Sequence, residues 1–116
     1  PHAVMQVDDI ESQLVNQLGP ELENHPAFPK RVNAGFMQIV SRTQMKLRVY
    51  ERGAGWTLAC GTGACAAMVI AHKWGLIDDE VQIELPGGSL TISWDGEGDV
   101  IMTGPATRVY EGRIQV

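Results

Sequence analysis

The sequence has little cysteine, no long apolar run and no excess of basic charge, and each absence excludes a class of protein. Its longest apolar run, residues 64–71, has eight residues, whereas a membrane-spanning helix needs about 20. Nine basic against fourteen acidic side chains give a net charge of −5, opposite to the footprint of a nucleic-acid-binding protein. Residues 1–4 lack the features of a signal peptide and contain no initiator Met, so we expect a piece of a longer protein.

The cysteines and histidines limit the redox and metal chemistry that the sequence can support. Cys60 and Cys65 are five residues apart in a predicted helix, where their side chains diverge too far for a disulfide. Two free thiols indicate a reducing compartment, and we expect the cytoplasm. His2, His25 and His72 do not have metal-ligand spacing with one another or with the cysteines, so we predict no metal site.

The length and composition predict one domain, residues 1–116, with a core of its own. The chain is 44% hydrophobic and 20% charged, which is ordinary for a globular domain of this size. Alternating or β-branched residues predict strands over Ala3–Val7, Ala34–Val40, Met45–Tyr50, Val81–Leu85, Leu90–Trp94 and Asp99–Thr103. Glycine-rich turns separate the last three, which should therefore form an antiparallel meander.

The first predicted helix is amphipathic and covers about Ile10–Leu18. Asp8-Asp9 supplies its N-terminal cap, and Gly19-Pro20 stops it. Its apolar residues 10, 14 and 18 share one face, so we expect the helix to lie on the surface with this face turned inward.

The second predicted helix, Gly61–Trp74, is apolar or small on every side up to His72, and Gly75 ends it. A helix that is apolar all round is expected to be buried all round. Its alanines keep it thin, so strands can approach it closely. The predicted fold is therefore α+β, with a curved, mostly antiparallel sheet wrapped around one central buried helix.

The segment before this helix carries the candidate site. Cys60 stands where the helix begins, and the unpaired N–H groups and dipole of a helix N-terminus favour an anion. The same field stabilises a thiolate, and cysteines at such positions can have pKa values well below the free value of about 8.5. Gly61 and Gly63 should leave N–H groups open to a carboxylate, and Thr62 adds a hydroxyl. We expect Cys60 to be reactive and Cys65 to be a buried structural thiol.

Charged residues lead into this segment. Glu51 and Arg52 follow the third predicted strand and would be a solvated pair in isolation. Beside a reactive thiol they are better interpreted as recognition groups, since a guanidinium binds a carboxylate through two hydrogen bonds. Asn33 is either a turn residue or a ligand contact.

These motifs together resemble the diaminopimelate epimerase family along nearly the whole chain. The matching stretches are Pro-His-Ala-Val at 1–4, Asn-Ala-Gly-Phe-Met-Gln at 33–38, Tyr-Glu-Arg-Gly-Ala-Gly at 50–55, Ala-Cys-Gly-Thr-Gly-Ala-Cys-Ala-Ala at 59–67, Glu-Leu-Pro-Gly-Gly at 84–88 and Met-Thr-Gly-Pro-Ala at 102–106. The resemblance implies an enzyme without a cofactor, built from two lobes with the substrate between them. This chain would be the C-terminal lobe.

The implied activity is the interconversion of LL- and meso-2,6-diaminoheptanedioate, a step of lysine and peptidoglycan-precursor synthesis. One cysteine removes the α-proton and another returns it from the opposite face. By resemblance, Cys60 would be the catalytic thiol of this lobe, supported by His2 and Glu51. Gly61 and Thr62 would bind the carboxylate at the reacting carbon.

The resemblance also implies partners. Asn33, Glu51 and Arg52 would bind the distal end of the substrate, and Tyr110 matches a position associated with homodimerisation. The second cysteine would belong to an N-terminal lobe that this chain lacks, so the chain alone should be inactive. At position 56 the family usually has Glu, whereas this sequence has Trp56.

Two other hypotheses stay open. One keeps the fold but changes the substrate, as in cofactor-independent racemases of other amino acids; Glu51, Arg52 and Asn33 favour a dicarboxylic diamino substrate instead. The other is a non-catalytic, thiol-bearing binding module, in which Cys60 would react with iodoacetamide no faster than Cys65.

Overall fold

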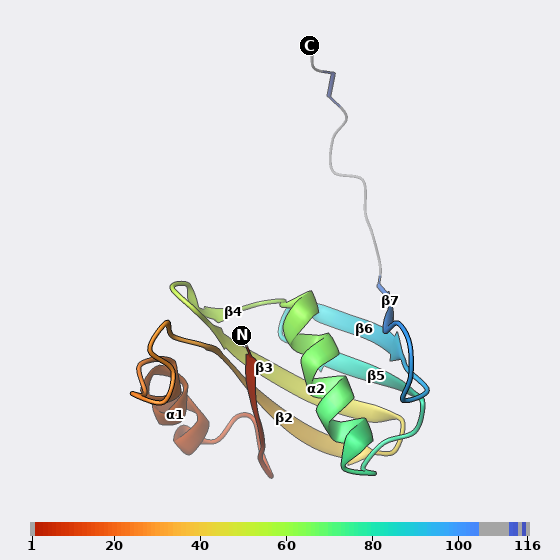
Figure 1. Cartoon of the computed structure of the whole chain (residues 1–116), viewed down its shortest axis with the longest axis horizontal. Coiled ribbons are helices and arrows are strands. Elements are labelled where there is room, and N and C mark those ends of the chain that lie inside the picture. Colours follow the sequence, from red (N-terminus) through yellow and green to blue (C-terminus); the bar gives the residue numbers. More distant parts are fainter. Residues whose placement is uncertain (1, 105–111, 114, 116) are drawn as a thin grey trace.

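The computed structural model describes residues 2–104, 112, 113 and 115, and all elements below lie within them. In chain order they are β1 (His2–Gln6), α1 (Gln13–Glu23), β2 (Asn33–Ser41), β3 (Gln44–Glu51), β4 (Gly55–Thr57), α2 (Gly61–Lys73), β5 (Glu80–Leu85), β6 (Gly88–Ser93) and β7 (Ile101–Thr103) (Figure 1). The sheet has the order β1-β2-β3-β5-β6-β7, and β4 pairs with β3. The β1–β2 and β3–β5 pairs are parallel, and the other pairs described are antiparallel. The predicted α+β fold with a mostly antiparallel sheet is confirmed, as is the meander of β5, β6 and β7.

The two helices pack on opposite faces of the sheet. Successive side chains of a strand point to opposite faces, and neighbouring residues of β2 show this directly. Met37 belongs to the larger core cluster, together with Leu47 of β3 and Met68 of α2. Phe36 belongs to a second cluster that includes Val15 of α1. The sheet therefore has a core on each side.

Helix α2 begins and ends almost where the sequence predicts. Cys60 is its N-cap and Trp74 its C-cap, one residue earlier than expected. Gly75 adopts a φ of 73°, which favours glycine, and its N–H donates to His72 O while Leu76 N–H donates to Ala71 O. Neither helix in the described residues is long and apolar enough to cross a membrane.

The prediction that α2 is buried all round is wrong for this chain. The side toward the sheet is buried, including Ala64, Ala67 and Ala71, which have no exposed surface. On the other side, Ala66 and Val69 are only half-buried. The sheet curves along one side of α2 without closing around it (Figure 1). Part of the apolar surface of the helix is therefore not covered by the described residues.

Helix α1 differs from its prediction at its start. Ser12, not Asp8-Asp9, is the N-cap, and its hydroxyl accepts a hydrogen bond from Val15 N–H at 3.4 Å. The Asp9 carboxylate instead accepts from Glu11 N–H in a turn, and the Ile10 N–H donates to the Gln38 side chain. Turn formation by an Asp side chain competes with helix capping, and here the turn places Ile10 in a buried position.

Helix α1 also continues through the predicted stop at Gly19-Pro20. Gly19 is buried, and a Cβ added there would lie 2.8 Å from Trp56 Cζ2, so its small size serves close packing. Asn24 is the C-cap, and its backbone and side-chain N–H groups both donate to Pro20 O. The shifted helix leaves Leu14 59% exposed, contrary to the predicted inward face.

Candidate functional site

Most of the predicted site residues gather at one end of the sheet. His2 and Asn33 are partners across β1 and β2, and Glu51 ends the adjacent strand β3. Helix α2 begins on the same side of the molecule (Figure 1). The topology thus brings together residues that are far apart in the sequence.

Cys60 lies at the start of α2, as predicted. Its backbone is extended, with φ −147° and ψ 97°, and its Sγ accepts a hydrogen bond from Gly63 N–H at 3.4 Å. The Thr62 hydroxyl oxygen is 3.7 Å from the same sulfur. The sulfur therefore takes the place that the oxygen of a Ser or Asp cap occupies in other helices.

Two details of this helix start differ from the sequence prediction. The Gly63 N–H is directed to the sulfur and not to an external carboxylate. Cys60 is only 7% exposed, which makes it less open than expected. The N–H groups of Gly61 and Thr62 belong to the first turn, where no preceding helical carbonyl exists to accept from them, so they are the groups suited to an anion.

Asn33 and Arg52 are tied together across β2 and β3. The Arg52 backbone N–H donates to Asn33 Oδ1 at 2.6 Å, and the Arg52 guanidinium donates to Lys30 O at 3.4 Å. Asn33 thus holds the start of the β3–β4 turn. Its amide NH₂ group and the exposed Arg52 guanidinium are the parts available to a ligand.

His2 and Glu51 are close enough to influence each other. Burial lowers the pKa of the His2 imidazole, and the negative charge of Glu51 raises it in part. Desolvation is the larger effect, so the neutral imidazole is favoured. The neutral imidazole is the form of His2 that can accept a proton.

The second thiol, Cys65, is half-buried and packs against the larger core cluster. Burial raises its pKa, which keeps it protonated at neutral pH. This environment agrees with a structural thiol, although the side chain is less buried than predicted.

Two contacts around the start of α2 were not predicted from the sequence. The Gly87 N–H donates to Leu58 O at 2.8 Å, and a Cβ at Gly87 would lie 2.9 Å from that oxygen. The Met102 side chain covers Gly61, with its Cε 3.2 Å from an added Cβ. Gly61 and Gly87 indicated a close contact in the sequence, since glycine often marks a close approach to backbone. The sequence did not indicate which residues these glycines contact.

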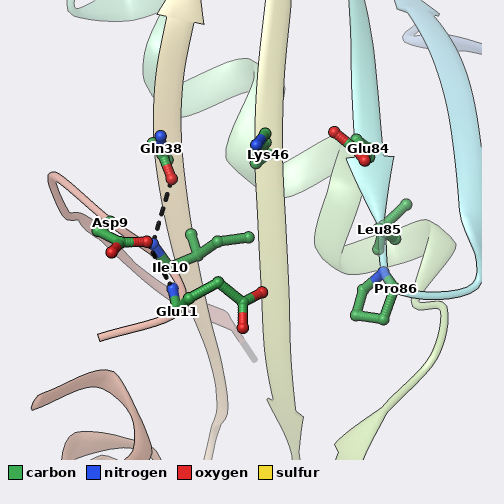
Figure 2. A pocket seen from close by; sticks show the side chains of 8 residues that line it. All are labelled: Asp9, Ile10, Glu11, Gln38, Lys46, Glu84, Leu85 and Pro86. Atoms are coloured by element: carbon green, nitrogen blue, oxygen red, sulfur yellow. Dashed lines mark hydrogen bonds between the residues drawn. The ribbon is translucent and has the colours of Figure 1, made fainter. Parts of the chain in front are cut away.

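A hollow of about 190 Å³ lies elsewhere, on the sheet face opposite α2. Figure 2 shows Gln38, Lys46 and Glu84 on three neighbouring strands there, with Glu11 beside them and α2 behind the sheet. None of the predicted site residues lines it. Among the described residues no group of three or more His, Cys, Asp or Glu side chains could hold a metal ion. Tyr110 lies outside the described residues.

Comparison with known proteins agrees with the motifs. The family model for diaminopimelate epimerase matches residues 1–109. The chain is 60% identical to the diaminopimelate epimerase of Ectopseudomonas mendocina and 59% identical to that of Chromobacterium violaceum, over 100% of this chain and 42% of each relative. It is 61% identical to that of Cupriavidus taiwanensis, of which it covers 41%. The chain thus spans less than half the length of these relatives.

Solved structures support the fold independently. A phenazine biosynthesis PhzC/PhzF protein from Clostridium difficile matches 83% of this chain and 34% of its own, with a TM-score of 0.62 at 16% identity. A PhzF-family protein from Enterococcus faecalis matches 82% and 34%, with a TM-score of 0.60 at 14% identity. At such identities the likeness concerns the fold alone. The motifs, the matched family model and the relatives lead to one conclusion: the chain belongs to the diaminopimelate epimerase family.

Proposed function

We propose that this chain is the C-terminal lobe of an enzyme that interconverts LL- and meso-2,6-diaminoheptanedioate without a cofactor, and that Cys60 exchanges the α-proton. The observation that carries the proposal is the position of the Cys60 sulfur at the N-cap of α2, 3.4 Å from Gly63 N. The sequence relatives, named diaminopimelate epimerases, support the choice of substrate.

The helix start fits the electrostatic demand of the reaction. The α-proton of an amino acid is a very weak acid, so removing it requires stabilisation of the negative charge that develops. We place the α-carboxylate at the N–H groups of Gly61 and Thr62. The Cys60 thiolate takes the proton, and the electron pair of the broken C–H bond delocalises toward the carboxylate oxygens. Helix-start N–H groups and the α2 dipole stabilise this charge more strongly in the transition state than in the bound substrate.

We assign the distal end of the substrate to Asn33 of β2, Glu51 of β3 and Arg52, which follows β3. The Arg52 guanidinium matches a second carboxylate, the Glu51 carboxylate matches an ammonium group, and the Asn33 amide can donate to either oxygen of the carboxylate. A monocarboxylic amino acid would leave Arg52 without a partner. This set of groups favours a diamino dicarboxylate over the substrate of another racemase.

Inversion of the stereocentre needs an acid on the face opposite Cys60. We assign it to a cysteine of a second lobe, because a single lobe approaches the α-carbon from one side. His2 and Glu51 would support the chemistry by influencing the thiols. Homodimerisation through Tyr110 and a cytoplasmic location belong to the same proposal.

The test uses Cys60→Ser, with Cys65→Ser as matched control, in the protein that includes both lobes. Each epimer is incubated in deuterium oxide, and α-deuterium incorporation is followed by mass spectrometry. Cys60→Ser should abolish incorporation into at least one epimer, because a serine hydroxyl is a far weaker acid than a thiol. Cys65→Ser should retain it. Incorporation into both epimers by a folded Cys60→Ser protein would reject the role of Cys60.

A further inference from the structure

The Trp56 side chain joins three elements on the face of the sheet opposite α2. Its ring lies edge-on to Tyr50 of β3, with centroids 5.2 Å apart at 84°, and 5.8 Å from Phe36 of β2. The ring also contacts Gly19 of α1, where an added Cβ would lie 2.8 Å from Trp56 Cζ2. The fit leaves no room for a side chain at Gly19.

Arg48 of β3 also contacts the Trp56 ring. Its guanidinium carbon lies 4.2 Å from the centroid of the Trp56 ring, a cation–π contact. The same guanidinium donates to Ile10 O at 2.9 Å and to Asn16 Oδ1 at 3.1 Å. The indole is therefore fixed against α1, the segment before α1, and two strands.

Trp56 is the central residue of β4, and β4 leads directly to Cys60. The strand has only three residues, and its backbone pairs with β3 alone. Between β4 and α2, the Leu58 carbonyl is fixed by Gly87 N–H. Trp56 has the largest side chain of the three β4 residues, and it contacts α1, β2 and β3 four residues before the thiol.

We propose that Trp56 is a positioning residue for Cys60: by clamping β4 to α1 and Arg48, it holds the N-cap of α2 in the geometry that the reaction requires. This inference rests on the proposed function for its catalytic consequence. Trp56 packs against the core cluster of Phe36 and Val15, whereas Cys60 belongs to the other cluster, so Trp56 acts through the backbone of residues 57–60.

The experiment compares Trp56→Leu with Trp56→Phe, and uses Trp74→Leu as matched control. Trp74 caps the other end of α2 and is 55% exposed. In each protein, iodoacetamide alkylation of Cys60 and Cys65 is followed by peptide mass spectrometry, and epimerisation is measured in the protein with both lobes.

Releasing β4 should expose the buried Cys60 sulfur and misplace it. Trp56→Leu should raise the Cys60 alkylation rate about threefold or more and leave that of Cys65 unchanged, since local opening does not require global unfolding. It should lower kcat about tenfold or more with KM changed less than about twofold, because a small misplacement of a reacting group costs rate more than binding. Trp56→Phe retains the aromatic contacts and should restore most of both values, and Trp74→Leu should match the parent.

Equal acceleration at Cys60 and Cys65 would mean that Trp56 contributes only global stability and would overturn the inference. Unchanged alkylation and kcat in Trp56→Leu would also overturn it. If Trp56→Leu does not fold, the alkylation rates and kcat of Trp56→Phe are compared with those of the parent, and the same criteria apply to the smaller differences. The alkylation measurement needs no substrate, so it tests the inference even if the parent protein exchanges no α-proton, which would reject the proposed function instead.

Discussion

Gly63 is the residue whose change tests the geometry of the helix start most directly. An added Cβ would lie 3.1 Å from Cys60 Sγ and 3.1 Å from Val49 Cγ2, and both contacts are tighter than ordinary van der Waals packing. Val49 is 1% exposed and Cys60 is 7% exposed, so neither neighbour can move into solvent. Gly63→Ala must therefore displace the sulfur, the strand or the helix.

The expected free energy follows from two opposing effects. Overpacking a buried site costs about 1–3 kcal/mol. Replacing glycine by alanine in a helix returns about 1 kcal/mol. We therefore expect Gly63→Ala to lower the free energy of unfolding by about 1 kcal/mol, within a range of roughly 0–2 kcal/mol.

Gly61→Ala is the matched control, two residues earlier in the same helix. Its Cβ would meet the Met102 Cε at 3.2 Å and Sδ at 3.3 Å, which are the flexible end of a side chain that is 49% exposed. Met102 can move, so this variant should equal the parent in stability or exceed it by up to about 1 kcal/mol.

The assay is urea unfolding of the chain, followed by circular dichroism. With a typical slope for this size, the two midpoints should differ by roughly 1 M. Only Gly63→Ala should also change the alkylation rate of Cys60. A Gly63→Ala chain as stable as Gly61→Ala would refute the packing described around the Cys60 sulfur.

Two further predictions concern binding and pH. Arg52→Ala should weaken binding of the substrate, because the distal carboxylate loses its partner. The free energy of unfolding should stay nearly unchanged, because the backbone N–H of residue 52 still donates to Asn33. Calorimetry compares the loss of binding for the substrate and for an analogue without that carboxylate, and an equal loss for both would contradict the prediction. Burial raises the pKa of Cys65, so the folded chain holds this proton to higher pH than the unfolded chain, and stability should fall as the pH rises past the ordinary thiol pKa. Cys65→Ala should remove part of this alkaline loss, as measured by urea unfolding between neutral and alkaline pH; an identical loss in the variant would show that Cys65 does not cause it.

The sequence predicted the elements whose signals are local. Helix α2 and its glycine terminator follow from a long apolar segment bounded by cap residues, and the β5–β6 hairpin follows from alternation around Pro86-Gly87. The position of Cys60 at the start of α2 follows from the same local pattern. These predictions succeed because caps, turns and periodicity act within a few residues.

The α1 prediction failed where distant contacts compete with local ones. Gly19 and Pro20 are typical helix terminators, yet the helix continues through them because Gly19 packs against Trp56, far along the chain. Strand β4 was missed for a related reason: its three residues have too little periodicity of their own, and pairing with β3 defines it.

The sequence by itself determined the family motifs, the helix that Cys60 caps and the choice of residues for a site. Only the tertiary structure decided that His2, Asn33 and Glu51 share one end of the sheet with that helix start, that Gly63 N–H is directed to the Cys60 sulfur, and that Trp56 packs against Gly19 of α1. The physical reason is that capping and periodicity are short-range and recorded in neighbouring residues, whereas strand pairing and side-chain packing depend on which distant segments the folded chain brings into contact.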